Sequence, residues 1–101
     1  MSLEFGASKE ISFDAFEAVR RALEMDARYA LLPSTEPNRI LGRFAKYAVR
    51  EKWPEDIEVV FDGRKLRVLF HSGHRVDILA FLAALKAALA DNGYDCAFDE
   101  E

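Results

Sequence analysis

Alternation of apolar and polar residues predicts strands in several short segments of the chain. Residues 3–7 alternate in this way near the start, and residues 94–98 do so near the end. Successive side chains of a strand point to opposite faces, so the apolar members would share one buried face. A short apolar run at residues 29–32, ended by Pro33, adds a further strand.

Residues 57–70 carry the pattern of a β-hairpin. Apolar residues alternate over 57–61 and again over 66–70, with Asp62-Gly63 between the two runs. Asp-Gly is typical of a two-residue hairpin loop, since glycine tolerates the positive φ that such turns require. With these two residues as the loop, Glu58 would face Arg67 as a favourable cross-strand charge pair.

Apolar residues spaced by three and four predict three helices. The first runs over residues 13–23, with Ser12 as its N-cap. The second starts at the Ser-Thr-Glu-Pro segment 34–37 and runs to about Lys52, before Pro54. The third covers residues 76–91 and ends at Asn-Gly, a frequent C-terminal stop.

These elements predict an α+β fold. Strands that alternate have one wet face, so the helices should cover a single face of a mainly antiparallel sheet. The result is a two-layer α/β sandwich, loosely ferredoxin-like, with an extra helix from residues 34–52. A chain of 101 residues suits a single domain over 1–101, whose acidic end at 99–101 could fray.

Composition is that of an ordinary globular protein, with half of the residues apolar and about a third charged. Its usage of Ala, Arg and Leu is bacterial-like. Cys96 is the only cysteine, which excludes an internal disulfide and favours a reducing, cytoplasmic location. The longest apolar stretch, residues 78–85, is too short to cross a bilayer, so no membrane association is expected.

Four cations form the first candidate binding site. Arg39, Arg43, Lys46 and Arg50 are spaced by four, three and four residues, so they would share one sector of the second predicted helix. Such a basic helix face could dock an acidic protein patch or a phosphate backbone. The alternative is a solvated face, or one compensated by the acidic end of the chain.

A second candidate is an anion site at the junction before the last helix, formed by His71, Ser72, Gly73, His74 and Arg75. Amides at a helix start bind anions, glycine permits close approach, and arginine can hold phosphate or carboxylate with two hydrogen bonds. The alternative is a plain polar turn. With no carboxylate obviously placed to orient either histidine, no catalytic residue is assigned, and an enzyme is disfavoured. No metal or cofactor is expected, because the histidines and Cys96 lack ligand spacing.

The last helix has an alanine-rich side opposite its apolar stripe. This side comprises Ala80, Ala83, Ala84, Ala87, Ala88 and Ala90. So smooth a surface could let a second copy approach and form a homodimer. Alternatively it is only a solvated helix face, since alanine is the best helix former.

The sequence does not specify one function. We predict a non-enzymatic interaction module, of the adaptor, antitoxin, immunity or chaperone-like class, that docks an unidentified protein partner through the basic helix face. The alternative is a nucleic-acid-binding protein using the same helix and the hairpin cations Arg64, Lys65 and Arg67. A net charge of -4 and the absence of a nucleic-acid signature weigh against this alternative.

Overall fold

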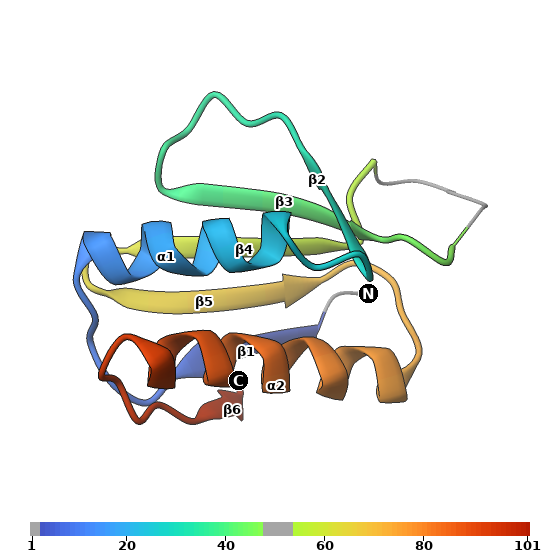
Figure 1. The fold of residues 1–101 in the computed structure, drawn as a ribbon. Coiled ribbons are helices and arrows are strands. Elements are labelled where there is room, and N and C mark those ends of the chain that lie inside the picture. Colours follow the sequence, from blue (N-terminus) through green and yellow to red (C-terminus); the bar gives the residue numbers. More distant parts are fainter. Residues whose placement is uncertain (1–2, 48–53) are drawn as a thin grey trace.

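The computed structural model describes residues 3–47 and 54–101 and shows a sheet with two helices on one of its faces (Figure 1). The elements are β1 (Leu3–Ala7), α1 (Phe13–Glu24), β2 (Tyr29–Leu32), β3 (Arg39–Phe44), β4 (Ile57–Asp62), β5 (Lys65–Phe70), α2 (Arg75–Asp91) and β6 (Phe98–Glu100). The predicted α+β class, with helices on one face of an antiparallel sheet, is confirmed. No helix within the described residues has the length and apolar character needed to cross a membrane.

Six strands form one sheet in the order β2-β3-β4-β5-β1-β6, and every neighbouring pair is antiparallel. Helix α1 therefore leads from β1, an inner strand of the sheet, to β2 at one edge. Helix α2 leads from β5 past β1 to β6 at the other edge. The loosely ferredoxin-like arrangement is not confirmed by this order.

A single hydrophobic core lies between the helices and the sheet. Its fully buried side chains come from both layers and include Phe16, Val19, Val59, Leu66, Val68, Phe81, Leu85 and Leu89. Burying one such side chain contributes about 1.5–3 kcal/mol, so this layer holds the domain together. Cys96 is fully buried, as its place in the sequence pattern predicted.

The N-terminus of α1 forms as predicted. Ser12 is extended, and its Oγ accepts a hydrogen bond from the amide of Ala15 at 3.1 Å. This bond satisfies one of the amides that the first turn of a helix leaves without a partner.

The prediction of a helix over residues 34–52 is wrong for the part that the structure describes, and so is the extra helix of the predicted fold. The Oγ of Ser34 accepts from the amide of Glu36 at 3.2 Å, which closes a turn instead of capping a helix. The chain then enters β3, which pairs with β2 on one side and β4 on the other. Backbone pairing on both sides outweighs the local helix signal.

The hairpin exists, but its predicted register is wrong by two residues. Asp62 pairs with Lys65, so the loop consists of Gly63 and Arg64. Gly63 has φ 71 at the first loop position, which is the position where a type II′ turn needs glycine. Consequently Glu58 pairs with Leu69 and not with an arginine.

The last strand starts later than the alternation of residues 94–98 predicted. β6 comprises Phe98–Glu100 and pairs with β1, so the acidic end forms a sheet edge in place of a frayed terminus. The amide of Glu101 continues this pairing by donating to the carbonyl of Glu4 at 2.9 Å.

We expect Gly73→Ala to destabilise the protein. Gly73 has φ 134, and a Cβ built on it would lie 2.8 Å from Cε2 of Phe44, so both the backbone and the packing resist a side chain. The free energy of unfolding in urea should fall by about 1–3 kcal/mol.

Gly42→Ala is the matched control. A Cβ at Gly42 would meet Leu31 Cδ2 at 3.5 Å, an ordinary contact. Its free energy of unfolding should change by less than about 0.5 kcal/mol. Equal losses in both variants would contradict the assignment of strain to Gly73.

Candidate functional site

The four predicted docking cations do not share a helix face. Arg39 and Arg43 lie on β3, Lys46 lies in the turn that follows, and Arg50 lies outside the described residues. A spacing of four places two side chains on the same side of a strand as well as of a helix, which made the two alternatives hard to distinguish. The Nε of Arg43 donates to the carbonyl oxygen of Pro54 at 2.5 Å.

Two of these cations are already matched by carboxylates of the same chain. The Nε of Arg39 lies 3.0 Å from Glu58 and 3.5 Å from Glu36. The Nζ of Lys46 lies 2.7 Å from Asp77. The geometric basis for a basic helix face is therefore wrong, and carboxylates of the same chain already compensate both of these charges.

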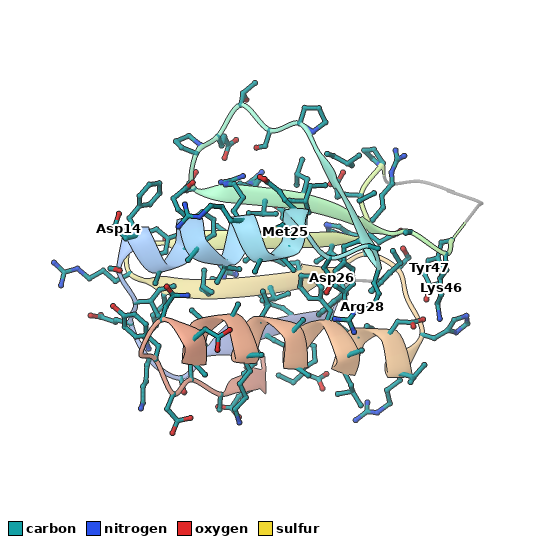
Figure 2. The ribbon with its side chains drawn as sticks, viewed as in Figure 1. Asp14, Met25, Asp26, Arg28, Lys46 and Tyr47 are labelled. Atoms are coloured by element: carbon teal, nitrogen blue, oxygen red, sulfur yellow. The ribbon has the colours of Figure 1, made fainter. Side chains whose placement is uncertain are left out.

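Side chains of the domain itself occupy the strand–helix junction at residues 71–75. The amide of His74, the N-cap of α2, donates to the hydroxyl of Tyr47 at 2.8 Å. That hydroxyl in turn donates to Asp77 at 2.7 Å. Lys46 and Tyr47 thus lie against the first turn of α2 (Figure 2). The start of α2 already has a carboxylate beside it, which disfavours an additional bound anion.

Asp56 also holds this junction in place. Among the described residues, Asp56 is the one charged residue that is buried, with 2% of its surface exposed. Its carboxylate accepts from the amide of Phe44 at 2.9 Å and from the hydroxyl of Ser72 at 2.5 Å. Ser72 is therefore a structural donor at this junction, to a carboxylate that also holds the end of β3.

Electrostatics at the start of α2 favour the ionised carboxylate of Asp77. The ammonium of Lys46, and then the hydroxyl of Tyr47, hold the pKa of Asp77 below its ordinary value of 3.8. Burial, followed by the hydrogen bond to Asp77, raises the pKa of Tyr47. At neutral pH the phenol is neutral and donates, while the carboxylate is charged and accepts.

Both edges of the sheet are poor templates for an added strand. β6 is short and carries Asp99 and Glu100. β2 has four residues and is followed by Pro33, which lacks an amide hydrogen. The hydrogen bond from Ala45 N to Arg28 O shows which opposed residues of β2 and β3 are hydrogen-bonded, and such pairs alternate along the strands. Leu31 belongs to a pair that is not hydrogen-bonded, so its amide and carbonyl point away from β3. Short, charged or proline-limited edges resist pairing with another chain.

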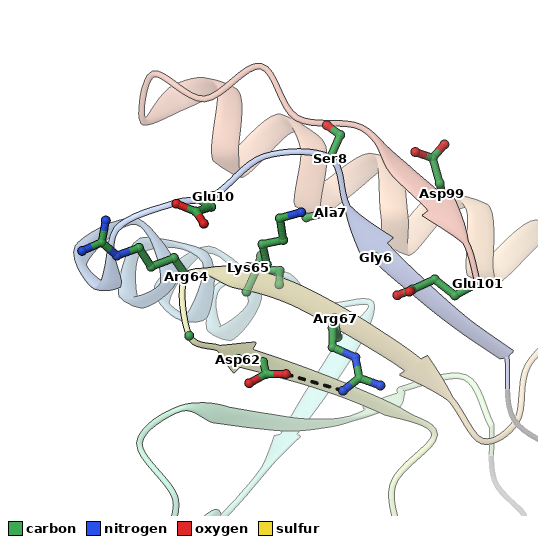
Figure 3. Close-up of a pocket in the computed structure, with 12 residues that line it drawn as sticks. Gly6, Ala7, Ser8, Glu10, Asp62, Arg64, Lys65, Arg67, Asp99 and Glu101 are labelled. Carbon is green, nitrogen blue, oxygen red and sulfur yellow. Dashed lines mark ion pairs between the residues drawn. The ribbon is translucent and has the colours of Figure 1, made fainter.

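The hairpin cations share a surface pocket with carboxylates. This pocket, of 790 Å³, lies beside β1 and β5, and its lining includes Glu10, Asp62, Arg64, Lys65, Arg67, Asp99 and Glu101 (Figure 3). Arg67 forms ion pairs with Glu4 and Asp62, and the hydrogen bond to Glu4 raises the pKa of Arg67. A phosphate backbone approaching these cations would therefore meet several negative charges as well.

The outer side of α2 remains largely apolar and exposed. Val76 is 70% exposed and Leu79 is 50% exposed, and Ala83, Ala87 and Ala90 are exposed as well. The predicted alanine face is thus only partly right, because Ala88 is buried and Ala80 and Ala84 are half-buried. Val76 and Leu79 were not predicted to belong to this face, although their spacing of seven and four residues from Ala83 fits it.

Among the described residues, one group could hold a metal ion. Glu55, Glu58 and His71 each offer a ligand atom, and these atoms lie within 4.8 Å of one another. No local spacing revealed the group, since His71 comes from the end of a neighbouring strand.

No protein family, no curated protein and no solved structure matches this chain. Function must therefore be argued from the geometry above.

We expect Asp77→Asn to lower stability at neutral pH. The pKa of Asp77 is depressed in the folded state, so its contribution is complete above 3.8 and is lost as pH falls through the folded value. Urea unfolding should show the variant less stable than the parent at pH 7, with the difference shrinking as the pH falls below 3.8.

Asp95→Asn is the control for this comparison, since Asp95 is exposed in the loop between α2 and β6. Its stability should follow that of the parent at every pH in this range. A deficit in Asp77→Asn that persisted undiminished into acid would contradict the role assigned to the charge.

Proposed function

We propose that this protein is a non-enzymatic interaction module that self-associates through the outer side of α2. The observation that carries the proposal is the row of Val76, Leu79, Ala83, Ala87 and Ala90, which are exposed and spaced by three or four residues. This row lies opposite the buried stripe of the same helix, so it forms one continuous surface.

A second copy of the chain fits this surface because the row is self-complementary. Within the exposed row, the large side chains Val76 and Leu79 lie toward the N-terminus of α2 and the alanines toward its C-terminus. In an antiparallel pair with its two-fold axis at Ala83, Leu79 of one copy would enter the hole between Ala83, Lys86, Ala87 and Ala90 of the other. The exposed Lys86 flanks this hole and can keep its ammonium in solvent while its methylene groups line the contact. Large side chains packing on small ones is the arrangement that fills helix interfaces without voids.

Charges at the helix ends favour the same orientation. Arg75 begins α2 and Asp91 ends it. The helix dipole favours a negative charge at the N-terminus and a positive charge at the C-terminus, so both residues have the less favourable sign within their own helix. In an antiparallel pair, Arg75 and the N-terminus of one helix would lie at the same end as Asp91 and the C-terminus of the other. Attraction between opposite helix ends therefore supports antiparallel over parallel packing.

The contact would be small. α2 has 17 residues and is about 25 Å long, so a pair of such helices buries less than about 1,200 Å² in total. We therefore propose a weak dimer with a Kd on the order of 10 to 100 µM. The protein would exchange between self-association and another partner of the adaptor, antitoxin, immunity or chaperone-like kind.

The cytoplasmic location is part of the proposal. Its support is that Cys96, the only cysteine, is buried and free. We do not extend the proposal to nucleic acid, because the hairpin cations share their pocket with carboxylates.

We expect Leu79→Lys to abolish the dimer. Two ammonium groups would be forced against an apolar surface, while the half-exposed position lets the monomer fold normally. Sedimentation velocity over a range of concentrations should show the parent self-associating and the variant remaining monomeric.

Thr35→Lys provides the matched control. It adds the same charge in the exposed loop between β2 and β3, away from α2 (Figure 1). This variant should sediment like the parent. A parent protein that is monomeric at about 1 mM would contradict the proposal, as would a Leu79→Lys variant that still dimerises.

A cysteine at the proposed axis tests the orientation of the pair. In Ala83→Cys the two thiols would meet across the two-fold axis, so mild oxidation should give a disulfide-linked dimer on a non-reducing gel. The native thiol of Cys96 is fully buried and should remain free.

Ala90→Cys separates antiparallel from parallel pairing. Its two thiols would be about 21 Å apart along an antiparallel pair, too far for a disulfide. We therefore expect cross-linking in Ala83→Cys only. Equal cross-linking of both variants would indicate parallel or random contact and would overturn the proposed geometry.

A further inference from the structure

The sheet face that α1 and α2 leave uncovered carries a group of three metal-ligating side chains. Glu55, Glu58 and His71 place their ligand atoms within 4.8 Å of one another. The side chain of Glu58 is only 13% exposed and that of His71 only 7%. Polar groups so poorly hydrated need a partner of opposite charge or a hydrogen bond.

Strand register explains how the group assembles. Glu58 lies on β4 opposite Leu69 of β5, and the amide of His71 donates to the carbonyl of Asp56 as the hairpin pairing continues. Glu58 on β4 and His71, directly after β5, therefore lie on the same face of the sheet. Glu55 reaches the group from the segment that leads into β4.

The two oxygens of Glu58 have different neighbours. Its Oε2 lies 3.0 Å from the Nε of Arg39, and its Oε1 lies 3.3 Å from the Nε2 of His71. The guanidinium thus neutralises one oxygen, while the other is directed at an imidazole that is itself a metal ligand when neutral.

The local charge balance is negative. Arg39 is shared between Glu36 and Glu58, and Glu55 adds a third carboxylate. Among the residues that the structure describes, three carboxylates thus face one guanidinium, with Glu36 half-exposed and Glu58 shielded from water. Carboxylates held close together repel unless a proton or a cation lies between them.

Geometry and ligand chemistry select the cation. Two ligands at 2.0–2.1 Å from a tetrahedral zinc ion lie about 3.4 Å apart, close to the 3.3 Å between Glu58 and His71. The ligand atom of Glu55 lies within 4.8 Å of the other two, and a side-chain rotation would bring it to the ion. One imidazole with two carboxylates suits borderline ions such as Zn²⁺, whereas Mg²⁺ and Ca²⁺ prefer oxygen ligands alone. We propose that Glu55, Glu58 and His71 form a site for a divalent transition-metal ion of the Zn²⁺ type.

Arg39 sets the strength expected of this site. Its positive charge acts on Glu58 from the side opposite His71 and opposes the charge of the ion. Three protein ligands also leave the fourth position of a tetrahedral ion to water. Binding should accordingly be weaker than at four-ligand structural zinc sites, and the apo protein should fold without the metal.

Calorimetric titration of the full chain with Zn²⁺, after treatment with a chelator, tests the site. We expect one ion per chain, and an excess of Mg²⁺ should not compete. Co²⁺ should give the visible absorption of a tetrahedral complex. In His71→Gln and Glu55→Gln, affinity for Zn²⁺ should fall by more than about tenfold.

His74→Gln is the matched control, because His74 is exposed three residues further along and lies outside the group. It should bind Zn²⁺ like the parent. Circular dichroism without metal checks that each variant is folded, and Glu55→Gln keeps the test decisive if His71→Gln unfolds, since Glu55 lies outside the strands.

Three results would overturn the proposal: no saturable binding of Zn²⁺, unchanged affinity in a folded Glu55→Gln or His71→Gln, or half an ion per chain. The last would mean that the ion bridges two molecules. In the first two cases the close approach of Glu58 to His71 is an ordinary hydrogen bond or ion pair. None of these outcomes bears on self-association through α2, which lies on the other side of the sheet.

Discussion

A buried carboxylate joins the parts of this domain that the chain itself keeps apart. Asp56 accepts hydrogen bonds from the amide at the end of β3 and from Ser72 after β5. Leaving a buried donor without its acceptor costs about 1–3 kcal/mol, so this residue ties the end of β3 to the turn that precedes α2. Tyr47 and Lys46, which follow β3, add a second link by contacting His74 and Asp77 at the first turn of α2.

Several charged side chains near these elements form ion pairs within the molecule. Arg39, Lys46 and Arg67 each contact at least one carboxylate of the same chain. Such pairs at partly exposed positions add little stability individually, but they reduce the charge available to a partner. The outer row of α2 differs because it exposes apolar surface. Burying apolar surface lowers the free energy whatever the net charge of the protein.

The two proposed sites lie on opposite sides of the sheet and depend on different physics. Self-association through α2 depends on the shape of large and small side chains along one helix. The metal site depends on strand register, which brings Glu58 and His71 within 3.3 Å across β4 and β5. Either site could exist without the other.

Local pattern determined the class of the fold, the cap at Ser12, the inward stripe of α2, the existence of the hairpin and the burial of Cys96. These features depend on period and on neighbouring residues, which one sequence displays directly. Tertiary structure alone decided that residues 39–44 form a strand, because two neighbouring strands supply hydrogen bonds that no local propensity can match. Tertiary structure also decided that Glu58 and His71 lie close together, since contacts between strands depend on their register. A register shift of two residues leaves every alternation in the sequence unchanged, so the sequence pattern cannot reveal it.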